Sequence, residues 1–314
     1  MRRSLAAIGL TLGLLALPSA ATAAPVALGM HTPGDPYGGS TQRIDALQHD
    51  LGRPVRIVSW FQNWGGEAWI RRPHRTLFDA VARSGRRPLV TWEPWVPGGG
   101  PWQSQYALVQ INAGAYDAYI ASWARALRRL HRPVYLRPMH EMNGNWYPWA
   151  GTVNGNSPRL FRAAWRHMHR IFRRAGARDV RWVWAPINDD FPNRRANRFE
   201  RYYPGRRYVD VLAVDGYNWG AGFPQHGGWR SFRTTFMRAY RRLRKLGRQR
   251  IWITEVGSSA VGGDKAAWVR DMFRATRVMP RLRAVVWMDT NSPGEGDWRA
   301  RFPAGTAEAF RSPK

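Results

Sequence analysis

Short segments rich in β-branched and aromatic residues recur along the whole chain, separated by stretches with helical periodicity. Most of these segments are near-continuous apolar runs, which are typical of strands buried on both faces of a parallel sheet. The eight segments are PVALGM, RPVRIVSWF, RPLVTWEPW, RPVYLRPMHE, VRWVWAPIN, YVDVLAVDGYN, RIWITEVGSS and RAVVWMDTN. The amphipathic stretches between them are clearest at residues 115–131, 158–176, 229–247 and 264–280,.

This alternation limits the fold to two α/β architectures. Strand and helix alternate eight times in a chain of 314 residues, and that number and size favour a closed (β/α)8 barrel, the TIM barrel,. A doubly wound open sheet is the alternative, but the chain has no G-x-G-x-x-G turn,. No linker or low-complexity tract divides the chain, so we predict a single domain. Its longer loops, at residues 96–114, 143–157 and 218–228, follow strands and would form the catalytic face.

The first residues have the pattern of an export signal. A pair of arginines precedes an apolar run at residues 5–17, and an A-x-A cleavage site follows at residues 21–23,. The apolar run is too short to span a bilayer. We therefore expect residues 1–23 to be a signal peptide and residues 24–314 to form the barrel. The mature protein should be a secreted monomer with no membrane partner.

The charge and the cysteine content narrow the function further. The formal net charge is +28, and nearly all of it is arginine because the chain has only three lysines. A polyanion partner, such as nucleic acid or an anionic wall polymer, is one explanation; arginine-rich codon usage on solvated helix faces is the other. The arginines are spread along the helices without a nucleic-acid motif, so we favour the second and expect no nucleic-acid partner. The absence of cysteine excludes thiol catalysis and thiolate metal sites,.

Acidic side chains at the predicted strand ends are few, and two of them stand out. The set is Glu93, Glu141, Asp189, Asp190, Asp215, Glu255 and Asp289. Glu141 ends the fourth strand and Glu255 ends the seventh, so the two would face each other across a small barrel. A strand-end acid more often caps a helix or pairs with an arginine. Two carboxyl groups on either side of a bond, however, are what glycoside hydrolysis requires.

Two other kinds of hydrolase are excluded by the motifs. A zinc site of the H-E-x-x-H type would need a second histidine where the chain has Gly144,. His167 and His169 lie two residues apart on a predicted helix and so do not share a face. A serine triad would need a G-x-S-x-G elbow, which the chain lacks,. We therefore expect neither a metal ion nor a cofactor.

The segment RPMHEMNGNWYPW, residues 137–149, resembles the acid/base segment of glycoside hydrolase family 26, a family of retaining (β/α)8 barrels. The resemblance extends to YPGRRYVDVLAVDGYNWG and WITEVGSS, and it runs from WFQNWG near the second strand to AVVWMD at the eighth. It implies Glu141 as general acid/base and Glu255 as nucleophile. An acid in this role must hold its proton, so its pKa must be raised by burial or by a nearby carboxylate.

The residues around this pair are the expected substrate-binding set. Arg137 lies four residues before Glu141, on the same face of the strand, where it can hold the negative charge of the site. The resemblance implies that Tyr217 contacts the nucleophile, that Trp287 stacks under the reacting sugar, and that His140 binds substrate or orients the acid. Alternation points His140 away from the face of Glu141, so we expect a local bulge. The other candidates are Asn143, Trp146, Asp215, Trp92 and Trp64.

The chain has eighteen tryptophans, and their positions suggest two uses. Those inside strands or on amphipathic helices should pack in the core; they are Trp123, Trp165, Trp182, Trp184 and Trp268. The others at strand ends or beyond are Trp60, Trp64, Trp92, Trp95, Trp102, Trp146, Trp149, Trp219 and Trp287. We expect about half of this second set to pack in loops and the rest to line a groove, because flat aromatic faces suit sugar rings.

The substrate implied by the resemblance is a β-linked polysaccharide. The family is best known for β-1,4-mannanases, so a secreted endo-β-1,4-mannanase is the first hypothesis. The family also contains mixed-linkage β-1,3-1,4-glucanases and β-1,3-xylanases, and WFQNWG is closer to the glucanase-like branch. A non-catalytic carbohydrate-binding barrel is the alternative from another class, but the presence of both carboxyl groups favours the enzyme. Asp189 and Asp190 either contact substrate or cap a helix.

Overall fold

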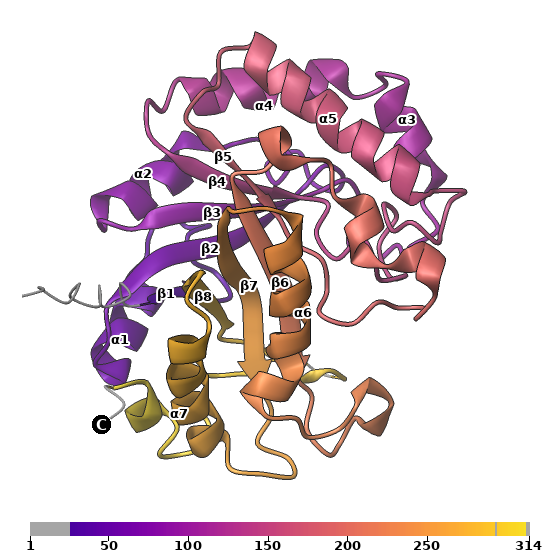
Figure 1. Cartoon of the computed structure of the whole chain (residues 1–314). Helices are drawn as coiled ribbons and strands as arrows, with labels where there is room; N and C mark the ends of the chain where they lie inside the picture. The colour runs from indigo at the N-terminus through magenta and orange to yellow at the C-terminus, as the bar shows by residue number, and fades with distance from the viewer. Residues whose placement is uncertain (1–25, 293, 312–314) are drawn as a thin grey trace, which may run out of the picture.

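The computed structural model describes residues 26–292 and 294–311, and in this part of the chain eight parallel strands close into a barrel in chain order (Figure 1). The predicted (β/α)8 barrel is therefore confirmed. The strands are β1 (Ala27–His31), β2 (Val55–Asn63), β3 (Arg87–Glu93), β4 (Val134–Pro138), β5 (Val180–Trp184), β6 (Val211–Asn218), β7 (Arg250–Ser258) and β8 (Leu282–Met288). A short hairpin follows, made of β9 (Asn291–Ser292) and β10 (Gly296–Asp297).

Helices lie around the outside of the strands (Figure 1). They are α1 (Gln42–Leu51), α2 (Arg75–Arg83), α3 (Leu108–Asn112), α4 (Asp117–Arg128), α5 (Pro158–Arg174), α6 (Phe232–Leu246) and α7 (Lys265–Ala275). Three of them begin at a capping side chain that accepts a backbone N–H: Ser157 for α5, Ser231 for α6 and Asp264 for α7,. The four amphipathic stretches of the sequence thus correspond to α4, α5, α6 and α7.

The connection from β5 to β6 departs from the expected alternation. It contains only 3-10 turns, η2 (Arg195–Asn197), η3 (Phe199–Tyr202) and η4 (Arg206–Tyr208), in place of an α-helix. Pro192 and Pro204 interrupt this segment, and Gly205 adopts a positive φ of 108°. Because proline removes a backbone donor and clashes with the preceding turn, no long helix can form here. The turn η3 packs instead against α5 and α6, and η4 packs against α5.

The inside of the barrel is apolar at one end and polar at the other. The apolar part consists of Ile57, Leu89, Val183, Ala185, Val211, Ala213, Trp252, Ala284 and Val286. Tyr135 of β4 and Trp252 of β7 have ring centroids 4.5 Å apart, although their strands are not neighbours in the barrel. Their contact therefore crosses the interior and closes it below the mouth. A second, larger apolar cluster packs the outer face of the strands against the helices.

The predicted signal peptide lies outside the described residues. Among the residues that are described, no helix combines the length and the apolar character needed to cross a membrane.

Candidate active site

A layer of polar side chains covers the apolar floor at the carboxyl end of the strands. Thr91 of β3 pairs in register with Arg137 of β4, and both are fully buried. Asp215 of β6 and Thr254 of β7 complete the layer, and Thr254 Oγ1 donates a hydrogen bond of 2.6 Å to Asp215 Oδ1. This is the face on which barrel enzymes place their chemistry.

Two backbone irregularities present Glu141 at this face. Strand β4 ends at Pro138, and both Met139 and Glu141 have positive φ values, 49° and 52°. A left-handed conformation is uncommon for residues other than glycine and tends to occur at functional sites. The backbone N–H of Glu141 donates to the carbonyl of Ala185 at 2.7 Å, which fixes the segment against β5. The expected bulge in β4 is therefore wrong: two left-handed residues, not an inserted strand residue, turn His140 and Glu141 toward the mouth.

A bulge is present in β7, where it presents Glu255. The pairing of β6 with β7 shifts so that Val214 lies opposite Ile253 while Asp215 lies opposite Glu255. Thr254 is left without a partner in this register, and the strand turns locally, as bulges beside active sites do. Both Thr254 and Glu255 consequently reach groups inside the barrel, although they are consecutive in the strand.

Arg137 joins the carboxylates below the mouth. Its Nη1 donates to Asp215 Oδ2 at 2.8 Å, and its Nη2 donates to Glu255 Oε1 at 2.5 Å. Its Nε and Nη2 also donate to Thr91 Oγ1, at 3.1 and 2.6 Å, so the guanidinium has a fixed orientation. Burial acts to lower the pKa of Arg137, but the carboxylates of Asp215 and Glu255 raise it above its ordinary value. The predicted role of Arg137 in holding the negative charge of the site matches these contacts.

The two glutamates have different surroundings. The Glu255 carboxylate accepts from Arg137 on Oε1 and from the Tyr217 hydroxyl on Oε2, at 2.5 Å each, so both oxygens are held by donors. Glu141 accepts a hydrogen bond from Trp146 Nε1 at 2.8 Å and has no cationic partner at that distance within the described residues. Burial raises the pKa of Glu141 well above its usual range, and the nearby Glu255 and Asp215 carboxylates raise it further,.

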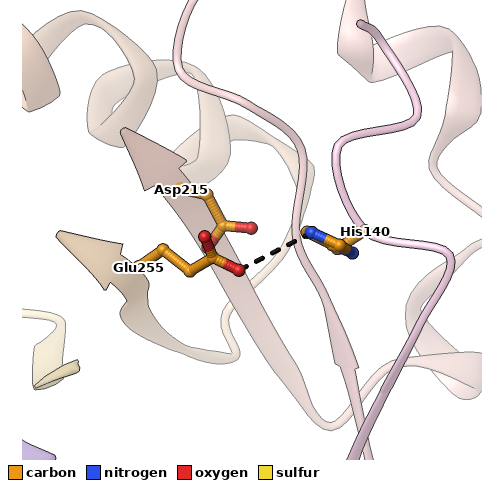
Figure 2. Close-up of side chains that lie close together, drawn as sticks. All are labelled: His140, Asp215 and Glu255. Atoms are coloured by element: carbon orange, nitrogen blue, oxygen red, sulfur yellow. Dashed lines mark ion pairs between the residues drawn. The ribbon is translucent and has the colours of Figure 1, made fainter. Parts of the chain in front are cut away.

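His140 lies between two acids. Its Nε2 is 3.6 Å from Glu255 Oε1, and its Nδ1 is 3.8 Å from Glu93 Oε1. Figure 2 shows the His140 ring facing the Glu255 carboxylate, with Asp215 beside Glu255. Burial and the charge of Arg137 lower the pKa of His140 well below its ordinary value, so the ring is neutral. Both ring nitrogens are buried, and neither makes a hydrogen bond within the described part of the chain.

His140, Asp215 and Glu255 together have the donor set of a cation site. One ligand atom of each lies within 4.8 Å of the others (Figure 2). The Arg137 guanidinium, however, already donates to both carboxylates. A second cation at this point would meet that charge at close range, so the cluster is better explained as the floor of the site, with Arg137 as its cation,.

Glu93 adds a further carboxyl group to the mouth. Its Oε2 accepts from Asn63 Nδ2 at 2.7 Å and from Trp95 Nε1 at 3.3 Å. No hydrogen bond in the described ranges engages its Oε1, which faces His140. Burial raises the pKa of Glu93 to about 8, with a smaller contribution from the charge of Glu255. The sequence identified Glu93 as a strand-end acid without giving it a role.

Two of the predicted substrate-binding polar residues are engaged in holding the site together. Asp215 is fully buried and bonds to Arg137 and Thr254, and burial raises its pKa to about 8. Asn143 is also buried; its side chain accepts from the Ile187 N–H and donates to the Ile187 carbonyl and to Asp190. The polar atoms of both side chains are therefore already engaged within the protein, and contact of these two residues with substrate stays a prediction.

The two aspartates after β5 also have structural partners. Asp190 accepts from Asn143 and from the Phe199 N–H, and it forms an ion pair with Arg242 at 2.8 Å. Asp189 is exposed and pairs with Arg230 at 2.7 Å. Asp190 thus stabilises the loops under the acid segment, and neither aspartate lies among the groups that surround Glu141 and Glu255.

About half of the tryptophans at strand ends and in loops are buried, as the sequence suggested. The buried half, however, includes three that were predicted to bind substrate. Trp64, Trp92 and Trp287 were predicted to line the groove, but all three are buried in the layer between strands and helices. In β3 and β8 the tryptophan alternates with inward-facing neighbours and so points outward. Trp60 and Trp149 are buried as well, whereas Trp146 is 36% and Trp102 is 72% exposed. Of the tryptophans predicted to bind substrate, only Trp146 is exposed.

Several groups at the mouth were not predicted. The Trp298 ring, which is buried, lies 5.0 Å from the ring of Tyr217. On the opposite wall, the rings of Phe61 and Tyr147 lie 6.1 and 4.9 Å from that of His140. Phe61 follows Ser59 at an inward-facing position of β2, and that alternation is the signal that would have identified it.

A closed barrel with two glutamates presented at the carboxyl ends of β4 and β7 defines the class of glycoside hydrolase barrels,. The family model described as Glycosyl hydrolase family 26 matches residues 102–236. Endoglucanase H of Acetivibrio thermocellus is 36% identical over 278 residues, which are 87% of this chain and 29% of that protein. The chain belongs to glycosyl hydrolase family 26.

Other similar proteins match a shorter segment of this chain or share its fold at low sequence identity. A mannan endo-1,4-beta-mannosidase of Bacillus subtilis is 31% identical over 116 residues, 34% of this chain and 30% of that protein. An endo-beta-1,4-mannanase double mutant of Cellulomonas fimi has the same fold, with a TM-score of 0.66 at 19% identity over 91% of this chain and 70% of that one. The chain spans less than a third of the length of these curated relatives.

Proposed function

We propose that the protein hydrolyses a β-linked polysaccharide by double displacement, with Glu255 as nucleophile and Glu141 as general acid/base. The observation that carries the proposal is the contrast between the two carboxyl groups. Glu255 accepts hydrogen bonds from the Arg137 guanidinium and the Tyr217 hydroxyl, so each of its two oxygens is held by a donor, as suits a positioned nucleophile,. Glu141 is buried beside two carboxylates, and its raised pKa favours the protonated form that a general acid needs,.

Each group then has one role in the first step. Glu255 attacks the anomeric carbon and forms a covalent ester with the sugar, while Glu141 gives its proton to the departing oxygen. As the carboxylate charge of Glu255 is lost, Arg137 remains paired with Asp215, so no cation is left without a partner. In the second step, Glu141, now ionised, removes a proton from water, and that water releases the sugar with net retention of configuration.

For the substrate, we propose a β-glucan that is cut at internal bonds. The relative matched over most of this chain carries the name Endoglucanase H, whereas the mannan endo-1,4-beta-mannosidases match about a third of it. The WFQNWG segment, which contains Phe61 of the mouth, agrees with this choice. Mannan is the second candidate, since several relatives carry that name, and β-1,3-xylan is the third.

The test is hydrolysis of lichenan, mannan and β-1,3-xylan, with Glu255→Ala as control for each. Release of oligosaccharides from lichenan, and none by the control, is the expected result. Mannan as the preferred substrate would overturn the glucan assignment, and activity in Glu255→Ala would overturn the mechanism.

The mechanism predicts different behaviour for the acid. Glu141→Ala should still form the covalent intermediate from a dinitrophenyl glycoside, because that leaving group needs no proton. The intermediate should accumulate, giving a burst, and azide should accelerate its release because azide needs no general base. Full loss of the burst would contradict the role of Glu141.

We also propose that the mature protein is secreted as a monomer, since residues 1–23 have the pattern of a signal peptide,. Recovery from the culture medium of a chain that starts near Ala24, with the mass of one copy in light scattering, is the expected result. Retention of residues 1–23 on the purified protein would contradict it.

A further inference from the structure

A cavity of about 610 Å³ lies beside the loop that carries Glu141. Three connections form its walls: the segment after β3, the segment after β4, and the 3-10 turns between β5 and β6. Trp102 comes from the first, Asn145 and Thr152 from the second, and Arg194 and Tyr202 from the third. None of these residues belongs to the cluster around Glu255, so the cavity is separate from the site already described.

The floor of the cavity is tied to the acid loop. The Tyr202 hydroxyl donates to Asn197 Oδ1, and Asn197 Nδ2 donates to the backbone carbonyl of Asn143 at 2.8 Å. Asn154 Nδ2 donates to the carbonyl of Pro101 at 2.7 Å and so holds the Trp102 segment against the β4 loop. These hydrogen bonds fix the position of the cavity relative to the loop that carries Glu141.

The rim of the cavity presents unused binding groups. Trp102 is 72% exposed, and no aromatic ring of the described residues packs against it. The Asn145 amide and the Arg194 guanidinium make no hydrogen bond or ion pair within residues 26–292 and 294–311. A flat apolar face with polar groups beside it suits a neutral sugar ring, whose C–H face stacks while its hydroxyls bond at the edge.

The position of Glu141 determines which part of a polysaccharide would reach this cavity. The acid protonates the departing oxygen, so the departing saccharide must begin on the side of Glu141. Trp146 bonds to Glu141 on that side, and the Phe191 ring, 54% exposed, lies 6.3 Å from the Trp146 ring. The chain neighbours of these two aromatic residues, Asn145 and Pro192, line the cavity. Exposed aromatic surface thus runs from the acid toward the cavity.

We propose that this cavity binds a sugar unit of the departing part of the polysaccharide, several units from the cleaved bond, with Trp102 as its stacking surface. Asn145 and Arg194 supply the hydrogen bonds to its hydroxyl groups. The proposal rests on the proposed function, because it needs Glu141 to mark the departing side. A distant site of this kind makes the enzyme favour long chains over short ones, since only long chains reach it.

The first test compares Trp102→Ala with wild type on two substrates. Trp102 is exposed, so its removal leaves the core unchanged, and Phe302→Ala, another exposed aromatic that does not line the cavity, is the matched control. For polysaccharide, kcat/KM of Trp102→Ala should fall about 5–10-fold, the size expected for one stacked ring. For a dinitrophenyl glycoside, which has no saccharide on the departing side, kcat/KM should stay the same. Phe302→Ala should behave as wild type on both.

The possible outcomes distinguish a failure of the cavity proposal from a failure of the proposed mechanism. An unchanged kcat/KM on polysaccharide, or equal losses on both substrates, would overturn the cavity proposal while leaving the mechanism in place. A wild-type protein without activity on either substrate would instead overturn the proposed function. A second measurement uses Glu255→Ala to bind a long oligosaccharide without cleaving it. Its affinity in calorimetry should fall several-fold when Trp102→Ala is added, and equal affinities would overturn the proposal.

Discussion

Removing the hydrogen bond from Trp146 to Glu141 should move the alkaline limit of activity upward. Trp146 Nε1 donates to Glu141 Oε2 at 2.8 Å, and this bond stabilises the ionised carboxylate,. It therefore lowers the pKa of a group whose pKa burial has already raised. In Trp146→Phe the donor is lost while an aromatic ring is kept, so the pKa of Glu141 should rise further. Glu141 acts as an acid only when protonated, and the variant should stay active to a higher pH.

The size of the shift follows from the bond. A hydrogen bond to a charged group contributes about 1.5–3 kcal/mol, and partial exposure of the indole favours the low end,. This corresponds to about one pKa unit, since one unit is about 1.4 kcal/mol. The assay is kcat/KM on polysaccharide against pH, where the alkaline limb reports the acid of the free enzyme. Trp102→Phe, which keeps its ring and does not touch Glu141, should leave the limb in place. If the alkaline limb of the pH profile stays at the same pH or moves to lower pH in Trp146→Phe, the reasoning is refuted.

Three further results are expected. Tyr217→Phe loses the donor to Glu255 Oε2, so kcat/KM should fall about 10–100-fold in steady-state assays, and an unchanged value would contradict the contact,. For Glu93→Gln, the free energy of unfolding relative to that of wild type, measured with urea, should increase between pH 5 and 8 by up to about 1.4 kcal/mol per pH unit. The reason is that the native state of wild type keeps a proton that the unfolded state has lost, and a constant difference would argue against this,. If the arginine excess is only a solvated surface, hydrolysis of a neutral polysaccharide should change little between low and moderate salt, whereas a steep dependence would point to a polyanion partner,.

The barrel could be predicted because most of its strands are nearly continuous apolar runs. Such runs are typical of a parallel sheet that is covered on both faces. The missing helix between β5 and β6 had a visible cause in Pro192 and Pro204, but the overall alternation was the stronger signal. The position of Trp92 was also open to prediction. It lies between Thr91 and Glu93, so if these face the barrel axis, alternation turns the tryptophan outward.

The site residues that lie in specific short motifs could be predicted from the sequence. Those whose positions depend on tertiary contacts could not. The segment around Glu141 and the one around Glu255 identified both carboxyl groups. The left-handed backbone at Met139 and Glu141 could not be foreseen, because neither residue favours it in isolation,. The bulge at Thr254 left no mark in the pattern of β7. The use of Asn143 inside the loops depends on the β5–β6 connection, whose path no local periodicity encodes.

The central claim is that Glu255 forms a covalent bond with the sugar, and trapping that bond tests it most directly. A dinitrophenyl 2-deoxy-2-fluoro-β-glycoside of the preferred substrate should react with wild type, because the leaving group departs readily while the fluorine slows the second step. Peptide mapping by mass spectrometry should then find one sugar on the peptide that contains Glu255, and activity should decline as the adduct forms. A single adduct is expected, together with retained configuration in the first product of normal turnover. An adduct on Glu141 or Glu93, or an inverted product with no adduct, would contradict it.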